Sequence, residues 1–223
     1  MNKQHLDFSE RLTKASEALG IELDGQQSEK ILKYISQLQR WNKTYNLTAL
    51  RDPEQMLIQH IFDSLSVVPF VHDELGRQAK AQAKIMDVGS GAGLPGVILA
   101  IANPNWEITC VDAVEKKMAF VRQMSAVLEL PNLKATHHRV ESLPPYDADI
   151  VISRAFASLY DFVSLASLHV SSGGRILAMK GRQPESEITE LTEQTVWSVD
   201  HIEPLAVPEL DAQRCLVYLS QQG

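Results

Sequence analysis

One short stretch, in which an acid is followed by glycines at alternate positions, has residue types and spacing that indicate chemistry. Residues 84–96 read Lys-Ile-Met-Asp-Val-Gly-Ser-Gly-Ala-Gly-Leu-Pro-Gly, an apolar run that ends in Asp87 and continues into glycines. Glycine lets a backbone turn sharply or lie against a ligand. The stretch predicts a strand, a tight turn and a helix that begins near Pro95, with its free N–H groups aimed at the turn. A nucleotide-like cofactor is therefore expected there.

Two cofactors are compatible with these glycines. Residues 91–96 match the G-x-G-x-x-G pattern of dinucleotide-binding proteins, so an NAD-dependent oxidoreductase stays open. Asp87 favours S-adenosylmethionine, because a carboxylate repels a pyrophosphate at short range but tolerates an ammonium and a sulfonium. Asp112 ends the next apolar run, where it can accept both ribose hydroxyls of either cofactor.

Helical periodicity dominates the first 75 residues, which precede the glycine stretch. Asp52-Pro53-Glu54-Gln55 predicts a helix start with Asp52 as N-cap and Gln55 completing a capping box. The apolar stripes of the three expected helices are Leu12, Ala15 and Leu19; Ile31, Ile35, Leu38 and Trp41; and Met56, Ile61 and Leu65. We expect an N-terminal helical extension over residues 1–75 and one compact domain over 76–223.

From Lys84 onward, apolar strands alternate with helices. The expected strands are 84–88, 107–112, 134–140, 148–153 and 174–180, followed by runs at 195–203 and 214–220. This alternation is typical of a doubly wound parallel α/β sheet. Ligands bind at the carboxyl ends of such strands. The residues expected there are Asp87, Asp112, Val140-Glu141, Ser153-Arg154 and Met179-Lys180.

Charge argues against a general nucleic-acid binder. The chain has a formal net charge of −7, whereas such binders usually carry a basic excess. Residues 30–60 nevertheless hold five Lys or Arg against two acids, and residues 186–211 hold seven acids and no Lys or Arg. A basic face and an acidic face are compatible with these counts, as is ordinary solvated surface.

Cysteine usage and hydropathy point to the cytoplasm. Cys110 and Cys215 sit in apolar runs, which suits buried thiols in a reducing compartment. No His, Cys or carboxylate cluster has metal-ligand spacing, so no metal is expected. No apolar run approaches the roughly 20 residues of a membrane span, and the N-terminus lacks the apolar region of a signal peptide. We expect no membrane partner.

Three further stretches carry a family resemblance. Residues 41–53 (Trp-Asn-Lys-Thr-Tyr-Asn-Leu-Thr-Ala-Leu-Arg-Asp-Pro), 91–96 and 151–159 (Val-Ile-Ser-Arg-Ala-Phe-Ala-Ser-Leu) resemble the RsmG (GidB) family, and the likeness extends from about Leu32 to Leu219. It implies a class I S-adenosylmethionine-dependent methyltransferase with a Rossmann-like, seven-stranded, mostly parallel sheet. The implied reaction methylates N7 of a guanine in bacterial 16S ribosomal RNA of the small subunit, giving 7-methylguanosine and S-adenosylhomocysteine.

The resemblance also implies cofactor contacts. Gly89, Leu94, Val140, Glu141 and Arg154 match the positions that bind the cofactor in the family. With the residues chosen from the sequence pattern, the expected cofactor set is Asp87, Gly89, Gly91, Leu94, Asp112, Val140, Glu141 and Arg154. The expected partner is 16S RNA in the small subunit or an assembly intermediate, with no DNA, and the protein is expected to be a monomer.

Guanine N7 constrains the catalytic groups. It has an in-plane lone pair and no proton to lose, so transfer needs alignment and desolvation more than a base. No side chain is assigned as an acid or base. We predict instead that Arg154, Lys180, Arg182 and Arg214 hold RNA or cofactor anions.

Other methylation chemistries fit the sequence less well. Methylation at pyrimidine C5 needs a nucleophilic cysteine on a loop at the carboxyl edge of the sheet, where neither cysteine is expected. Pro144-Pro145-Tyr146 resembles an amine-methylating loop, but it precedes the fourth strand and lacks the leading acid, so we interpret it as a stiffened loop. A methyltransferase with a non-ribosomal substrate and a non-catalytic S-adenosylmethionine-binding protein stay open.

RNA contacts are the least determined part of the sequence. Our hypothesis is an RNA face formed by the basic segment from Lys30 to Arg51 with Lys180-Gly181-Arg182. Trp41 and Tyr45 lie four residues apart in this segment, a spacing that also suits a simple packed pair.

Overall fold

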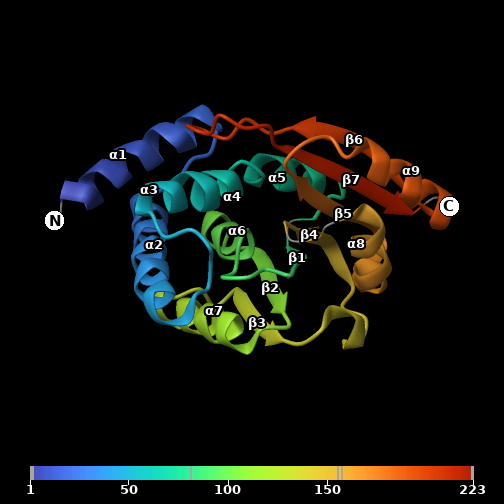
Figure 1. The fold of residues 1–223 in the computed structure, drawn as a ribbon, viewed down its shortest axis with the longest axis horizontal. Helices are drawn as coiled ribbons and strands as arrows, with labels where there is room; N and C mark the ends of the chain where they lie inside the picture. Colours follow the sequence, from blue (N-terminus) through green and yellow to red (C-terminus); the bar gives the residue numbers. More distant parts are fainter. Residues whose placement is uncertain (1–2, 81, 155, 157, 222–223) are drawn as a thin grey trace.

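A seven-stranded sheet with helices on both sides forms the described part of this computed structural model, residues 3–80, 82–154, 156 and 158–221 (Figure 1). Its strand order is β3-β2-β1-β4-β5-β7-β6. Strands β1 to β5 pair in parallel, and β7 is antiparallel to both β5 and β6. The bounds are β1 Ala83–Val88, β2 Trp106–Asp112, β3 Leu133–His137, β4 Ala148–Ser153, β5 Val170–Lys180, β6 Trp197–Pro204 and β7 Cys215–Gln221. The expected doubly wound, mostly parallel sheet is confirmed.

The strand order reverses between β1 and β4. The chain runs outward from β1 through β2 to β3 and then crosses back to β4 on the other side of β1. Loops that follow β1 and β4 therefore diverge, which leaves a crevice at their carboxyl ends. This is the edge at which the sequence places its acids and glycines.

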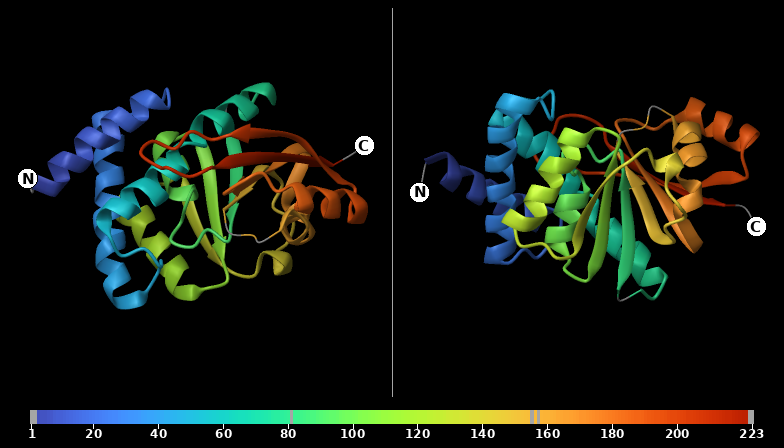
Figure 2. Two further views of the ribbon diagram at one scale, coloured as in Figure 1. Left: turned by 45° about the horizontal axis from the view of Figure 1, so that its top comes forward. Right: turned by 90° about the horizontal axis from the view of Figure 1, so that it is seen from below.

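Alternating side chains of the strands build two cores, one on each face of the sheet. Ile85, Ile150 and Leu177 belong to the first, while their neighbours Met86 and Val151 belong to the second. The first face is covered by α6 (Gly96–Ala102), α7 (Glu115–Val127) and the N-terminal helices, and the second by α8 (Leu159–Ala166) and α9 (Glu185–Gln194). The views in Figure 2 show the sheet between these two helical layers.

The N-terminal helices pack onto the first face. They are α1 (Lys3–Ala18), α2 (Gly25–Tyr45), α3 (Pro53–Met56), α4 (Asp63–Leu65) and α5 (Val68–Arg77), with a π-helical turn, Leu57–Phe62, joining α3 to α4. The three expected helices are confirmed, and their apolar stripes contribute to the same core as the sheet.

The third N-terminal helix differs from expectation in two details. Asp52 caps α3 by accepting from the Glu54 backbone N–H at 3.3 Å, as expected. The Gln55 side chain accepts a hydrogen bond from Gln59 one turn later, so the predicted capping box is wrong. The third helix also widens into the π-helical turn, which the apolar spacing did not predict.

Helix α6 begins at Gly96, directly after Pro95, as expected. One further boundary differs at the carboxyl edge of the sheet. Strand β3 ends at His137, and Val140 lies in a 3₁₀ turn, Val140–Ser142, because the chain bends over the end of β2, where the His138 N–H bonds the Asp112 carbonyl. A second 3₁₀ turn, Ser167–His169, precedes β5.

The two thiols agree with expectation. Cys110 and Cys215 are buried and free. Within the described residues, no helix is both long and apolar enough to cross a bilayer.

Candidate cofactor and RNA site

The loop between β1 and α6 is fixed by hydrogen bonds to its neighbours. Gly89 N–H donates to the Val111 carbonyl at 2.8 Å, and Gly91 N–H donates to the Asp112 carboxylate at 2.9 Å. Gly89 and Gly91 have φ of 66° and 61°, a conformation that glycine adopts without steric cost. The buried Tyr34 hydroxyl of α2 donates to the Ala92 carbonyl at 2.8 Å. The loop is therefore held in one shape by both the sheet and the N-terminal helices.

Asp87 lies beneath this loop rather than at its surface. Its side chain is fully buried, and Oδ2 accepts the Gly96 backbone N–H at 2.7 Å. Burial raises the pKa of Asp87 to about 7 against the opposing effect of that hydrogen bond. Oδ1 has no hydrogen-bond partner among the described residues. A side chain at Gly96 would overlap both Asp87 and Cys110, since its Cβ would lie 2.9 Å from Asp87 Oδ2 and 2.5 Å from Cys110 Sγ.

Two cavities flank the loop and share Gly89. The first, which we call the strand-edge cavity, measures about 330 Å³, and its lining includes Gly89, Asp112, Val140, Glu141 and Phe156. The second, which we call the helix-side cavity, measures about 220 Å³, and its lining includes Leu47, Thr48, His60, Gly89, Gly91, Leu94 and Arg154. Seven of the eight residues expected to contact the cofactor thus line one cavity or the other, and Asp87 supports the loop between them.

Asp112 presents a hydrogen-bonded carboxylate to the strand-edge cavity. Oδ1 accepts the Val114 N–H at 2.8 Å, and Lys117 Nζ lies 3.6 Å from Oδ2. Each carboxylate oxygen has capacity for a further donor. The 3₁₀ turn on the opposite wall is held by His169, whose Nε2 lies 2.9 Å from the Val140 carbonyl. The cavity therefore offers the Asp112 carboxylate from the end of β2 and the Val140 and Glu141 side chains from the 3₁₀ turn, which suits a nucleoside.

Arg154 extends from the end of β4 into the helix-side cavity. Its Nη1 donates to the Gln59 carbonyl at 3.1 Å and to Asp63 Oδ2 at 2.9 Å, and its Nη2 lies 3.5 Å from His60 Nδ1. Burial, helped by the Arg154 charge, lowers the pKa of His60 to about 4. His60 Nε2 lies 2.9 Å from the Thr48 hydroxyl. The cavity therefore contains one guanidinium beside an imidazole that is neutral at pH 7.

Arg214 binds the same carboxylate as Arg154, that of Asp63. Its Nε donates to Asp63 Oδ1 at 3.1 Å, because the end of β4 and the start of β7 lie at the same edge of the sheet. Sequence reasoning missed both Asp63 and His60. The available signal was Asp63 itself, a charged residue inside the apolar run Ile61–Leu65, because an acid at a core position needs a partner.

Lys180 and Arg182 lie in different surroundings. Lys180 Nζ donates to the Phe156 carbonyl at 3.2 Å and lies 2.7 Å from Glu187, which in turn accepts the Leu159 N–H at 2.9 Å. These bonds tie the loop after β4 to α9. Arg182 is exposed.

Part of the basic segment of α2 contacts α7 and is not free on the surface. Lys30 and Lys33 donate to carbonyls at the C-terminal end of α7, at 3.2 Å to Glu129 and 2.9 Å to Val127. Trp41 packs on Tyr45 and on Phe120 of α7, with ring centroids 5.0 and 5.4 Å apart. The two rings form a packed pair, while Tyr45 stays 46% exposed, so a role of Tyr45 in RNA contact stays a prediction.

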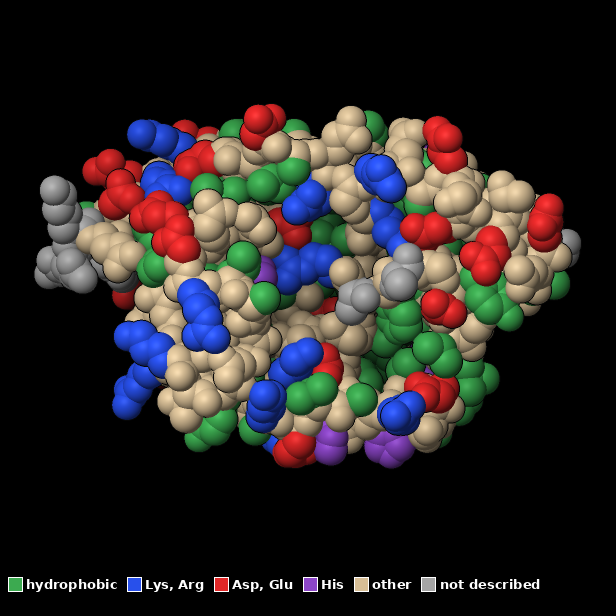
Figure 3. Space-filling view, in the orientation of Figure 1, with side chains coloured by type: hydrophobic (Ala, Val, Ile, Leu, Met, Phe, Trp, Pro, Cys, Tyr) green, Lys and Arg blue, Asp and Glu red, His purple; other side chains and the backbone are tan. Residues whose placement is uncertain are grey.

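Positive side chains gather in the middle of the face shown in Figure 3, and most acids lie nearer its margins. Several acids of the segment 186–211 are paired: Glu187 with Lys180, Asp200 with Arg175, and Glu209 with Arg11. The acidic face expected from the charge count is therefore partly neutralised.

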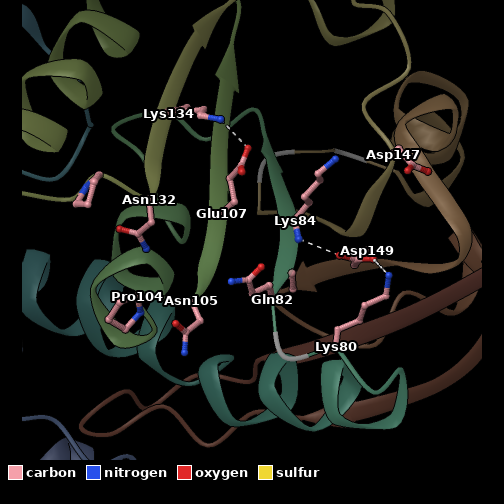
Figure 4. A pocket seen from close by; sticks show the side chains of 12 residues that line it. Lys80, Gln82, Lys84, Pro104, Asn105, Glu107, Asn132, Lys134, Asp147 and Asp149 are labelled. Carbon is pink, nitrogen blue, oxygen red and sulfur yellow. Dashed lines mark hydrogen bonds and ion pairs between the residues drawn. The ribbon is translucent and has the colours of Figure 1, made fainter.

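A larger polar hollow of about 550 Å³ lies at the opposite edge of the sheet, near the amino ends of the strands (Figure 4). Four of its charged side chains are paired with one another: Lys80 Nζ lies 3.0 Å from Asp149, and Lys134 Nζ lies 2.6 Å from Glu107. Ligands of open α/β sheets bind at the carboxyl ends, so we place the functional site around the glycine loop.

The sheet order, the glycine loop and the acid at the end of β2 define a class I S-adenosylmethionine-dependent methyltransferase fold. Solved methyltransferases share it. One from Aquifex aeolicus matches with a TM-score of 0.54 at 15% identity, over 78% of this chain and 96% of its own. Another, from Geobacter sulfurreducens in complex with S-adenosyl-L-homocysteine, matches with a TM-score of 0.52 at 11% identity, over 70% of this chain and 90% of its own.

Sequence comparison identifies the family. The family "GidB: rRNA small subunit methyltransferase G" matches residues 27–217, and the chain belongs to this family. Ribosomal RNA small subunit methyltransferase G of Bordetella petrii is 59% identical over 96% of this chain and 83% of its own length. The protein of the same name from Bordetella avium is 59% identical over 95% of this chain and 92% of its own. The dinucleotide-binding alternative is thereby excluded.

Proposed function

We propose that this chain transfers a methyl group from S-adenosylmethionine to N7 of a guanine in 16S ribosomal RNA of the small subunit. The observation that carries the proposal is the pair of cavities that meet at Gly89. One offers the Asp112 carboxylate to the nucleoside of the methyl donor, and the other offers Arg154 to its amino-acid portion, so the methyl group would lie where the two cavities meet. An acceptor base that approaches this point is aligned with the methyl group.

The residues present fit the cofactor. A Cβ built on Gly91 meets no atom within 4 Å, so ligand atoms have room to approach the loop. We assign the nucleoside to Asp112, Val140 and Glu141 and the amino-acid portion to Gly89, Gly91, Leu94 and Arg154. When bound, S-adenosylmethionine supplies an electrophilic methyl group on a sulfonium.

Methyl transfer to N7 does not require a general acid or base from the protein. One C–S bond breaks, one N–C bond forms, and the positive charge passes from sulfur to the purine without loss of a proton. The neutral His60 and the guanidinium of Arg154 can orient polar groups in the cavity, while the N-terminal helices exclude water. Product 7-methylguanosine and S-adenosylhomocysteine are the expected outcome.

We assign RNA binding to the exposed cations around the helix-side cavity. Arg40, Lys43, Arg51 and Arg182 are exposed, and Arg154 and Arg214 lie further in. We infer that Lys180 acts indirectly, through the loop after β4 that it holds. The division at residues 75 and 76, the monomeric state and a cytoplasmic location stay predictions.

The test is methyl transfer from labelled S-adenosylmethionine to small ribosomal subunits that lack the modification, beside naked 16S RNA. The proposal expects label in 7-methylguanosine, identified by mass spectrometry of the nucleosides. Label in another nucleoside, or none in either RNA while the cofactor binds, would contradict it. The second result would favour a non-ribosomal substrate or a non-catalytic binding protein.

A further inference from the structure

One buried carboxylate bridges two arginines beside the helix-side cavity. Asp63 is 2% exposed. Its Oδ2 lies 2.9 Å from Arg154 Nη1, and its Oδ1 lies 3.1 Å from Arg214 Nε. Each arginine side chain is 25% exposed. A carboxylate with so little access to water needs such partners, and it uses a different oxygen for each.

The π-helical turn Leu57–Phe62 places Asp63 in this position. Asp63 follows the turn directly, and Arg154 bonds both Asp63 and the Gln59 carbonyl inside the turn. A wider turn leaves carbonyls available to other groups, and such turns are frequent at functional sites. Arg154 is therefore anchored to the helical segment at two points.

Arg214 has one carboxylate anchor and a more open position. Its Nη1 donates to the Gln213 carbonyl at 2.9 Å. The same atom lies 3.9 Å from a Cβ built on Gly181, because the pairing of Lys180 with Cys215 brings the end of β5 beside the start of β7. Arg214 thus connects Asp63 to the basic turn after β5.

We propose that Asp63 is a positioning residue that holds Arg214 beside Arg154, so that Arg214 receives a phosphate of the substrate RNA. Within the described residues, Nη2 of Arg214 has no hydrogen-bond partner and so can meet a phosphate while Nε is held, and a fixed guanidinium loses little entropy when it binds. Two guanidinium groups and one carboxylate carry a local charge of +1 in a chain of net charge −7. This inference rests on the proposed RNA substrate.

The direction in which one substitution changes the RNA affinity shows whether Asp63 positions Arg214 or only reduces the local positive charge. Asp63→Asn keeps the side-chain shape but adds one positive charge to the pair. If Asp63 only reduced the positive charge, its removal would strengthen RNA binding, since binding is dominated by phosphate contacts. If Asp63 positions Arg214, the RNA affinity falls despite the added charge.

The first experiment compares Asp63→Asn with Asp211→Asn, a control with the same charge change at an exposed acid. The KM for unmodified small subunits should rise about tenfold in Asp63→Asn and stay near the wild-type value in the control. Calorimetric affinity for S-adenosylmethionine should change by less than about threefold, because Arg154 keeps its bond to the Gln59 carbonyl. An unchanged or lower KM, or a loss confined to cofactor affinity, would overturn the proposal.

Arg214 variants keep the proposal testable if Asp63→Asn does not fold. Arg214→Gln should reduce the slope of log affinity against log salt by about 0.7–0.9, which corresponds to one phosphate contact. Arg214→Lys should keep that slope and recover only part of the KM. Asp63→Asn combined with Arg214→Gln should be no worse in KM than Arg214→Gln alone. An unchanged slope in Arg214→Gln would contradict the assignment.

A failure of the proposed function can be distinguished from a failure of the inference about Asp63. Wild-type protein would then give no labelled 7-methylguanosine, whereas the salt dependence measures binding alone.

Discussion

The two cavities that meet at Gly89 are built in different ways. The strand-edge cavity is lined mainly by residues at or shortly after the ends of β1, β2 and β3, with Phe156 and Leu165 completing it, so the sheet fixes most of its shape. The helix-side cavity combines the glycine loop with Leu47 and His60 of the N-terminal region and with Arg154, which follows β4. Hydrogen bonds and ion pairs hold these segments together. The strand-edge cavity therefore depends on backbone geometry, and we call it the backbone half of the site. The helix-side cavity depends on charged side chains, and we call it the charged half.

The two halves also respond to protonation in opposite ways. Asp87, under the glycine loop, has a raised pKa, and His60, in the helix-side cavity, has a lowered one. Burial causes both shifts, because it disfavours the charged form of each group. Stability should therefore depend on pH differently in each half.

The largest expected effect comes from Gly96→Ala, which should disrupt the backbone half. The new Cβ would overlap Cys110 and Asp87, so α6 must shift and the bond between Gly96 and Asp87 lengthens. We expect a loss of about 2–4 kcal/mol in the free energy of unfolding. The affinity for S-adenosylmethionine, measured by calorimetry, should fall more than about tenfold.

Gly76→Ala is the matched control for this change. Gly76 lies in α5, and a Cβ built on it meets no atom within 4 Å. It should leave cofactor affinity at the wild-type value. Equal loss of cofactor affinity in both variants would show that the Gly96 contacts are not the cause.

The second prediction uses pH to separate the halves. The pKa of Asp87 is about 7 in the native state, against an ordinary value of 3.8 for an exposed aspartate. Protonated Asp87 therefore stabilises the folded protein fully below about pH 4, and this stabilisation is lost as the pH rises to 7. Relative to Asp87→Asn, wild-type protein should lose on the order of 2–4 kcal/mol over this range.

His60 should give the opposite slope. Its pKa is about 4 in the native state, against an ordinary value of 6.5 for an exposed histidine. Wild-type protein should therefore lose stability relative to His60→Gln as the pH falls from 6.5 to 4, by on the order of 1–3 kcal/mol. Urea unfolding of the cofactor-free proteins between pH 4 and 8 measures both slopes, with Glu190→Gln on the exposed side of α9 as control. Slopes of the same sign would refute the contrast between the halves.

A smaller effect is expected where the N-terminal helices support the glycine loop. Tyr34→Phe removes the hydroxyl that bonds the Ala92 carbonyl inside the core. We expect a loss of about 1–2 kcal/mol in the free energy of unfolding, because a buried carbonyl loses its partner. Cofactor affinity should fall a few-fold. Tyr160→Phe, at a half-buried position of α8, should leave cofactor affinity unchanged, and a similar loss in both variants would contradict the role of Tyr34.

The two halves also differ in how far the sequence predicts them. The glycine loop and Asp112 follow from local patterns, since apolar runs mark the strands and glycines mark the turn. The roles of Asp63 and His60 depend on partners 91 and 94 positions away, which no local pattern specifies. The π-helical turn cannot be predicted from the sequence either, because its apolar residues keep the spacing of an ordinary helix.

Arg182→Gln should give the smallest effect and sharpen the boundary of the charged half. Arg182 is exposed after β5, whereas Arg214 is held against Asp63. A flexible exposed cation loses side-chain entropy when it binds, which offsets much of its attraction for a phosphate. We expect the KM for small subunits to rise less than about threefold, with the difference vanishing at high salt. Kinetics at two salt concentrations check this. A loss as large as that of Arg214→Gln would extend the positioned surface to the turn after β5, and the contrast between held and exposed cations would fail.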